Sequence, residues 1–350
     1  MKFLPLRAAA LAAAMLAFAF LPAPAAAGSG LIVFGDDLSD QGNTHVAYGY
    51  PVAPEYYAGR YSDGPNWIDD LGLLLGTPAV NSLSGGTNYA YGEAVTGPGQ
   101  AVPPAPFVAP TIVAQADTYL TKVRGRASTT AQYVIFGGGI DSLAFFLQTE
   151  RDPLAVLELP LITARGTANL AAVVRRLVRA GATHILVLNL PDVGLLPIVR
   201  EATGLAGALG PSVGNTFAKD WNAELERQLR PYLGGPVTLE DFYNVTTMVD
   251  ADASKYGISD TTTACLQGYG VGGAVKDACS ASQESTYAFW DEVHFTRVGY
   301  LGMAEGALCA LGRPSVFGAR ANCIVTPANV SRSAQVADPA TLRALLAAAR

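Results

Sequence analysis

Charged residues are scarce in this sequence: Asp, Glu, Lys and Arg make up 15% of its 350 residues, and the net charge is −6. The Lys and Arg residues are scattered and form no basic run, which argues against a nucleic-acid-binding surface. Internal repeats are absent too, which excludes a repeat-protein architecture. Apolar residues are abundant, half of the total, and are accompanied by 37 Gly and 22 Pro. That composition suits one large α/β domain with a substantial core, or at most two smaller ones.

A long apolar run is found at the N-terminus, where residues 8–21 follow Lys2 and Arg7 and precede a small-residue end, Ala25-Ala26-Ala27. This order is typical of a secretory signal with an Ala-x-Ala cleavage site. The run is shorter than the ~20 residues that span a bilayer, and a retained anchor is the alternative interpretation. We expect a signal peptide over residues 1–27, cleavage near Ala27, and a secreted or periplasmic chain without a transmembrane segment after cleavage.

Cysteine is sparse, with four residues: Cys265, Cys279, Cys309 and Cys323. No His or second Cys lies at zinc spacing near any of them, so the sequence predicts no metal site here. An even number of cysteines in an exported protein indicates disulfides, and three pairings are possible. Because each closes a short local loop, the pairs Cys265–Cys279 and Cys309–Cys323 are favoured.

Short apolar runs alternate with amphipathic segments along the chain, an order that predicts a parallel sheet with helices on both faces. The expected strands are 31–34, 132–136, 184–190 and 237–239, and the expected helices are 66–75, 163–180 and 213–233. Residues 95–110 are rich in Pro, Gly and Ala and predict a loop on the active-site side. We expect one folded domain over residues 28–325 and a C-terminal tail with a short helix over residues 326–350.

The first strand ends in a small polar turn, residues 35–43, with the sequence Gly-Asp-Asp-Leu-Ser-Asp-Gln-Gly-Asn. A strand that breaks at a glycine into such a turn is where α/β enzymes place a nucleophile. The segment resembles the signature of the GDSL (SGNH) ester hydrolases, Gly-Asp-Ser-Leu-Ser-Asp-x-Gly-Asn. At the position of the catalytic serine of that family, this chain has Asp37.

Further blocks follow in the family's order. Residues 85–94 resemble its Gly-x-Asn-Tyr-Ala-x-Gly-Gly-Ala segment, with Gly86 at the oxyanion glycine, and residues 59–65 and 189–194 resemble two other segments. Residues 291–296 match its Asp-x-x-His-x-Thr block. The resemblance extends from about Leu31 to Leu311. It implies an SGNH-hydrolase (flavodoxin-like) α/β fold, a three-layer α/β/α sandwich with a mostly parallel central sheet.

The resemblance also implies acyl-transfer chemistry on carboxylic esters. In that chemistry a serine attacks the carbonyl, a histidine takes its proton, and an aspartate fixes the tautomer of the histidine. His294 and Asp291 match the last two roles, and a helix-capping surface pair is the alternative for them. We expect ester substrates such as lipids, acylated glycans or small esters, no cofactor, no nucleic-acid partner and a monomer.

Two departures remove parts of this apparatus. Asp37 replaces the nucleophile, and Ile140 replaces the oxyanion asparagine in the block Gly138-Gly139-Ile140-Asp141. Losing a triad nucleophile costs on the order of 10⁶ in turnover, and losing one oxyanion donor costs about 10²–10³. A third change places Glu93 where the family has a glycine, and we expect Gly138, Gly139 and Glu93 to contact substrate.

Three hypotheses remain open. The first is an ester hydrolase of weakened or altered activity, in which His294 activates water and Asp37 is a second acid partner of His294. The second is a catalytically inactive pseudoenzyme that binds an acylated ligand or partner. The third is a hydrolase in which Asp37 attacks an alkyl carbon, as in dehalogenase-type and epoxide-opening enzymes.

Two further alternatives concern single side chains. Asp36, Asp37, Asp291 and His294 could converge as metal ligands, although an Asp pair more often caps the following helix, and we expect no metal. Ser39 could replace the missing nucleophile, but it lies two residues further on and is expected to point elsewhere.

Overall fold

The computed structural model describes residues 30–202, 204–268, 276–277, 279–280 and 283–313. The expected signal peptide, the expected C-terminal tail and Cys323 therefore lie outside the described residues.

Four short strands form the central sheet, and all their pairings are parallel, in the order β1-β2-β3-β4. Their bounds are Leu31–Phe34 for β1, Gln132–Ile135 for β2, Ile185–Leu188 for β3 and Val237–Glu240 for β4. β1 and β3 are buried along their whole length, which explains why both are continuous apolar runs without alternation. The predicted parallel sheet is confirmed.

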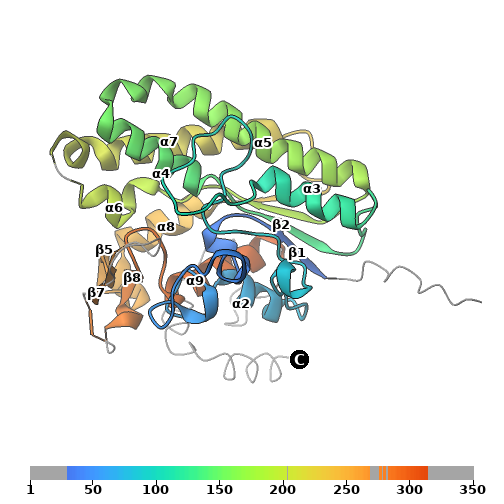
Figure 1. Ribbon diagram of the computed structural model, residues 1–350, viewed down its shortest axis with the longest axis horizontal. Coiled ribbons are helices and arrows are strands. Elements are labelled where there is room, and N and C mark those ends of the chain that lie inside the picture. The colour runs from blue at the N-terminus through green and yellow to red at the C-terminus, as the bar shows by residue number, and fades with distance from the viewer. Residues whose placement is uncertain (1–29, 203, 269–275, 278, 281–282, 314–350) are drawn as a thin grey trace, which may run out of the picture.

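Helices cover both faces of this sheet, which gives the predicted three-layer α/β architecture (Figure 1). On one face α3, α5, α7 and α4 pack against one another, and on the other α2 packs against α9, and α9 against α8. The helices are α1 Asn43–Tyr48, α2 Trp67–Leu74, α3 Ile112–Lys122, α4 Gly139–Arg151, α5 Leu159–Ala180, α6 Pro197–Arg200, α7 Gly204–Leu229, α8 Phe242–Ala251 and α9 Arg297–Ala310.

Local sequence explains where several helices begin and end. Asn66 and Asp69 form a capping box at the start of α2, and α5 ends at Gly181, whose φ is 110°. α5 begins earlier than predicted, because Pro160 is well suited to a first helical turn. α7 also begins earlier than predicted and contains Pro211.

A smaller strand region lies beside the main sheet and leads into the final helix. Strand β5 (Asp260–Ala264) pairs with β8 (Tyr287–Phe289), and β6 (Leu266–Gln267) pairs with β7 (Lys276–Asp277). The predicted disulfide Cys265–Cys279 closes this region, with Cα atoms 4.9 Å apart. The other expected pair, Cys309–Cys323, includes a residue outside the described ones.

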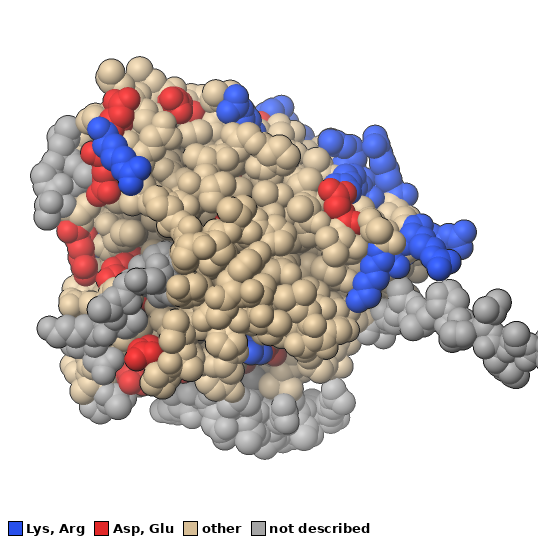
Figure 2. Space-filling model, in the orientation of Figure 1, with Lys and Arg blue, Asp and Glu red and all other residues tan. Residues whose placement is uncertain are grey.

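Among the helices of the described residues, none combines the length and the apolarity that a membrane crossing requires. Figure 2 shows one face of the molecule, on which Lys and Arg gather mainly at the right-hand edge and leave a broad central area without charge.

Candidate active site

The candidate site lies where the parallel strands end, the usual ligand-binding edge of an open α/β sheet. Asp37 follows β1 and begins η1, a 3₁₀ helix of one turn, Asp37–Ser39. Ile140 lies in the first turn of α4, just after β2. Asp291 and His294 lie between β8 and α9, far along the chain.

Asp291 and His294 form a tightly connected pair. The Nδ1 atom of His294 lies 2.7 Å from Oδ2 and 2.9 Å from Oδ1 of Asp291. Oδ1 also accepts hydrogen bonds from the backbone N–H groups of Val293 (2.9 Å) and His294 (2.7 Å), and Oδ2 accepts one from the hydroxyl of Tyr56 (2.7 Å). The orientation of the imidazole is therefore fixed from the Nδ1 side.

Asp37 meets the other ring nitrogen of the same histidine. Its Oδ2 lies 3.0 Å from Nε2 of His294, and its Oδ1 accepts a hydrogen bond from the backbone N–H of Leu38 at 2.9 Å. The side chains of His294, Asp291 and Asp37 are 0%, 0% and 3% exposed. The structure thus brings the three predicted residues together as a buried acid–histidine–acid arrangement.

The two carboxylates determine the protonation of the histidine. Burial by itself lowers the pKa of His294, but the charges of Asp291 and Asp37 outweigh it and raise this pKa to about 10. Burial also opposes ionisation of Asp291, yet His294 and the hydrogen bonds hold the pKa of Asp291 below its ordinary value. At neutral pH the imidazole is therefore protonated and positively charged, and it lies between the carboxyl groups of Asp291 and Asp37.

More acids surround this arrangement. Asp36 is fully buried, and burial, together with the charges of Asp37 and Asp141, raises its pKa well above the ordinary value. Burial raises the pKa of Asp141 to about 6, although that carboxylate accepts hydrogen bonds from the backbone N–H (3.0 Å) and the hydroxyl (2.7 Å) of Thr96. In the described part of the chain, no three His, Cys, Asp or Glu side chains group in a way that could hold a metal ion.

Among the described residues, no side chain lining the cavity beside Asp37 can donate a hydrogen bond to an oxyanion. Ile140 is 1% exposed and lines a cavity of about 30 Å³ together with Asp37 and Gly139. That volume has room for about two water molecules. Gly138 has a φ of 111°, and a side chain there would collide with Trp221, so Gly138 supports packing beside the cavity.

The structure does not bring the other predicted positions to this cavity. The N–H of Gly86 donates to the carbonyl of Asn81 at 3.1 Å, so it has no proton to offer an oxyanion. A side chain at Gly86 would collide with Val80, which is the packing reason for a glycine. Glu93 is buried at a φ of 63° and lies near Tyr61, whose pKa is raised well above the ordinary value by burial and then by Glu93.

Ser39 and two tyrosines, Tyr56 and Tyr61, lie close to these residues. The hydroxyl of Ser39 accepts a hydrogen bond from Nε1 of Trp67 at 3.2 Å, so it faces α2. The hydrogen bond from Tyr56 to Asp291 joins residues 235 positions apart, so no local sequence pattern predicts it. The ring of Tyr61, 4.8 Å from that of His294, is a second aromatic neighbour.

Comparisons with known proteins identify relatives of this chain. Among curated relatives, the chain is 28% identical over 322 residues to a phosphatidylcholine-sterol acyltransferase of Aeromonas hydrophila, covering 80% of this chain and 89% of that protein. It is 24% identical over 299 residues to a thermolabile hemolysin of Vibrio parahaemolyticus (79% and 62% covered). It is 23% identical over 335 residues to a GDSL esterase/lipase of Arabidopsis thaliana (79% and 84% covered).

Among solved structures, an alpha/beta hydrolase enzyme from the metagenome of Lake Arreo, Spain, aligns with a TM-score of 0.39 and 14% identity, covering 83% of this chain and 97% of that one. A family model described as GDSL-like Lipase/Acylhydrolase matches residues 31–307. The chain therefore belongs to the GDSL-like lipase/acylhydrolase family.

Proposed function

We propose that this protein is a carboxylic ester hydrolase whose turnover is suppressed near neutral pH by Asp37. The observation that carries the proposal is the 3.0 Å contact between Nε2 of His294 and Oδ2 of Asp37. This places a carboxylate where the family resemblance puts a serine hydroxyl, on the nitrogen that would take its proton.

The chemistry follows from the protonation state of His294. A general base must be unprotonated to accept a proton from serine or water. With a pKa raised to about 10 by Asp291 and Asp37 against the effect of burial, His294 carries a proton at pH 7. Residual hydrolysis by water activation is therefore expected to be slow at neutral pH and to rise toward pH 10.

The decisive experiment restores the missing groups. We expect Asp37→Ser to raise kcat for p-nitrophenyl acetate and butyrate by at least about 10²-fold, and the added Ile140→Asn to raise it by about another 10²-fold. Asp37→Asn is the matched control, because it lowers the pKa of His294 without supplying a nucleophile; any gain it gives measures release of the base alone, and the gain of Asp37→Ser should exceed it. A folded double variant without any gain would overturn the proposal.

The second candidate is the pseudoenzyme, favoured by the joint replacement of the nucleophile and the oxyanion donor by Asp37 and Ile140. Under that hypothesis the cleft binds an acylated ligand and releases it unchanged. Saturable ester turnover by the native chain near pH 10, where His294 begins to lose its proton, and its loss in His294→Ala would decide for the hydrolase.

Attack of Asp37 on an alkyl carbon receives less support. Oδ1 of Asp37 accepts a hydrogen bond from Leu38 and Oδ2 faces the protonated His294, so both oxygens are engaged. Mass spectrometry of the protein after incubation with epoxides and haloalkanes would reveal an alkyl ester on Asp37, and its detection would favour this route.

We also infer export of the chain. The pattern of residues 1–27 and the disulfide Cys265–Cys279 support it, since disulfides persist in oxidising compartments. N-terminal sequencing of the protein from the periplasm or medium should find a cut near Ala27.

A further inference from the structure

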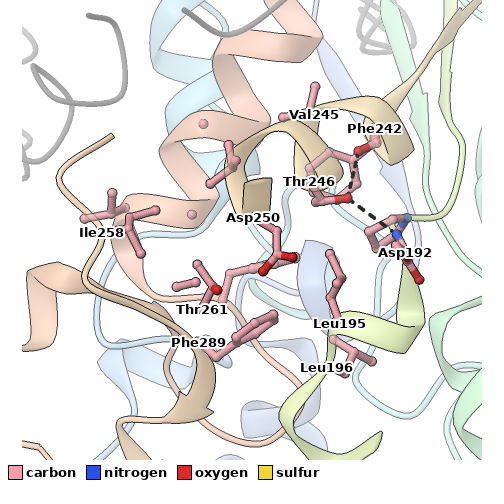
Figure 3. A pocket seen from close by; sticks show the side chains of 17 residues that line it. Asp192, Leu195, Leu196, Phe242, Val245, Thr246, Asp250, Ile258, Thr261 and Phe289 are labelled. Carbon is pink, nitrogen blue, oxygen red and sulfur yellow. Dashed lines mark hydrogen bonds between the residues drawn. The ribbon is translucent and has the colours of Figure 1, made fainter. Parts of the chain in front are cut away.

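A second cavity, of about 60 Å³, lies next to the candidate site and is almost entirely apolar (Figure 3). Its wall comes from α8, from the start of α9 and from the segments that flank β3 and β8. The side chains that define its interior include Leu195, Phe242, Val245, Phe289 and Val298. An apolar space of this kind is suited to hydrocarbon and poorly suited to a charged group.

This apolar cavity shares a wall with the cavity around Asp37. Pro191, Leu196 and Phe295 line both of them. The apolar cavity is therefore next to any ligand whose carbonyl group lies beside Asp37. The arrangement places a polar end and a hydrocarbon end of one ligand in neighbouring compartments.

The polar side chains at the edge of the apolar cavity already have protein partners. Asp250 pairs with Arg200 at 3.3 Å, and Arg200 also donates to the carbonyl of Thr261 at 2.8 Å. Asp192 accepts hydrogen bonds from the backbone N–H of Gly194 at 2.9 Å and from the side chain of Asn215. These polar groups are bonded to one another, so recognition inside the cavity depends mainly on apolar contact.

Gly302 keeps this cavity open. It lies in the interior of α9, where a glycine costs helix stability relative to alanine. It lines the cavity, and a Cβ atom added to it would meet no atom within 4 Å. Neither backbone geometry nor close packing therefore requires a glycine at position 302. The absence of a side chain there leaves the cavity larger than any other residue would.

We propose that the apolar cavity holds the acyl chain of a short-chain carboxylic ester whose carbonyl lies beside Asp37, and that Gly302 sets the length of chain that fits. This inference rests on the proposed ester chemistry of the Asp37 cavity. At roughly 15 Å³ for each water-sized group, the two cavities accommodate an acyl chain of about four to six carbons. Neutral esters are preferred over free carboxylates, because the carboxyl group of Asp37 lines the adjoining cavity and no Lys or Arg in the described part of the chain does.

Binding of methyl ketones tests the proposal without requiring turnover. The dissociation constants of 2-butanone, 2-pentanone, 2-hexanone, 2-heptanone and 2-nonanone would be measured by isothermal titration calorimetry with the native chain. Each added methylene should tighten binding about fourfold up to 2-heptanone and have little effect beyond it. A dissociation constant that does not change with chain length would overturn the proposal.

Variants of α9 locate the effect. Gly302→Leu should abolish the dependence on chain length, Gly302→Ala should shift the plateau by about one carbon, and thermal unfolding should show both variants folded. Ala310→Leu is the matched control, because Ala310 lies on the same helix but lines a different cavity, beside β4. An unchanged slope in both Gly302 variants would refute the site. The ketone series is independent of the Asp37→Ser assay, so failure of the ester-hydrolase proposal would be seen separately.

Discussion

The two blocks that meet in the site, residues 35–43 and residues 291–296, keep different parts of the catalytic apparatus. In the second block Asp291 holds His294 through Nδ1, as the acyl-transfer arrangement requires. In the first block Asp37 presents a carboxylate to Nε2 of the same ring. The carboxyl group of Asp37 in the first block therefore alters the protonation of His294, which the second block holds through Asp291.

The two acids also differ in how firmly each is held. Asp291 accepts hydrogen bonds from two backbone N–H groups, from the imidazole and from Tyr56. Asp37 accepts one from Leu38 and otherwise faces His294 and the small cavity. Asp291 therefore has more hydrogen bonds than Asp37, and we expect its replacement to disturb the folded structure more.

The largest expected effect concerns His294 in two backgrounds. In the Asp37→Ser/Ile140→Asn chain, His294→Ala should lower kcat by about 10³-fold or more, because the histidine then acts as the base for serine. In the native chain at pH 7 the same change should lower ester hydrolysis by less than about tenfold. Rates on p-nitrophenyl butyrate provide the measurement. Equal losses in both backgrounds would show that His294 already acts as a base beside Asp37.

Stability should separate the two acids next. Asp291→Asn should lower the free energy of unfolding by about 3–5 kcal/mol, the usual cost of breaking a buried ion pair from one side. Asp37→Asn should lower it by less, about 1–2 kcal/mol, because Asp291 still faces the imidazolium and an Asn oxygen can still accept from Leu38. Urea unfolding at pH 7 measures both values. Similar costs for the two variants would contradict the distinction between them.

The pH dependence sharpens the same comparison. A histidine whose pKa is raised in the folded state contributes stability that is fully present below about pH 6.5 and is lost as pH rises through the folded pKa. For His294, whose pKa Asp291 and Asp37 raise to about 10 against the effect of burial, the loss extends from about pH 6.5 to 10 and amounts to a few kcal/mol.

Asp37→Asn should lower the pKa of His294, so the pH-dependent loss of stability should be complete at a lower pH than in the native chain. NMR titration of the imidazole, together with urea unfolding at several pH values, follows both quantities. The proposal of a protonated resting state would fail if the native imidazole titrated near pH 6.5.

The sequence predicted β1, β2 and β3 because each is a short, mostly apolar run that ends near a Gly or Pro, as at Gly35 and Pro191. Helix starts were less accurate, since the first turns of α5 and α7 contain residues without a clear amphipathic pattern. Helices α3, α4, α8 and α9 were not predicted at all. Tertiary burial stabilises such helices more than local propensity does.

In the site, the sequence placed Asp37, Asp291 and His294 within matched blocks, and these three meet in the structure. The hydrogen bond from Tyr56 to Asp291 joins distant segments, so only the fold reveals it. Gly86 matched a motif position, but a motif does not record that its N–H already bonds Asn81.

A further expected effect concerns the disulfide that lies behind the second block. The N–H of Cys265 donates to Phe289 and that of Leu266 to Trp290, the residue before Asp291. The variant Cys265→Ala/Cys279→Ala should lose about 2–3 kcal/mol of unfolding free energy, because a bridge over 14 residues restricts a short loop of the unfolded chain. Urea unfolding with and without dithiothreitol measures this. A loss below about 0.5 kcal/mol would mean that hydrogen bonds alone hold this segment, whereas a further loss when the variant is reduced would reveal the Cys309–Cys323 pair.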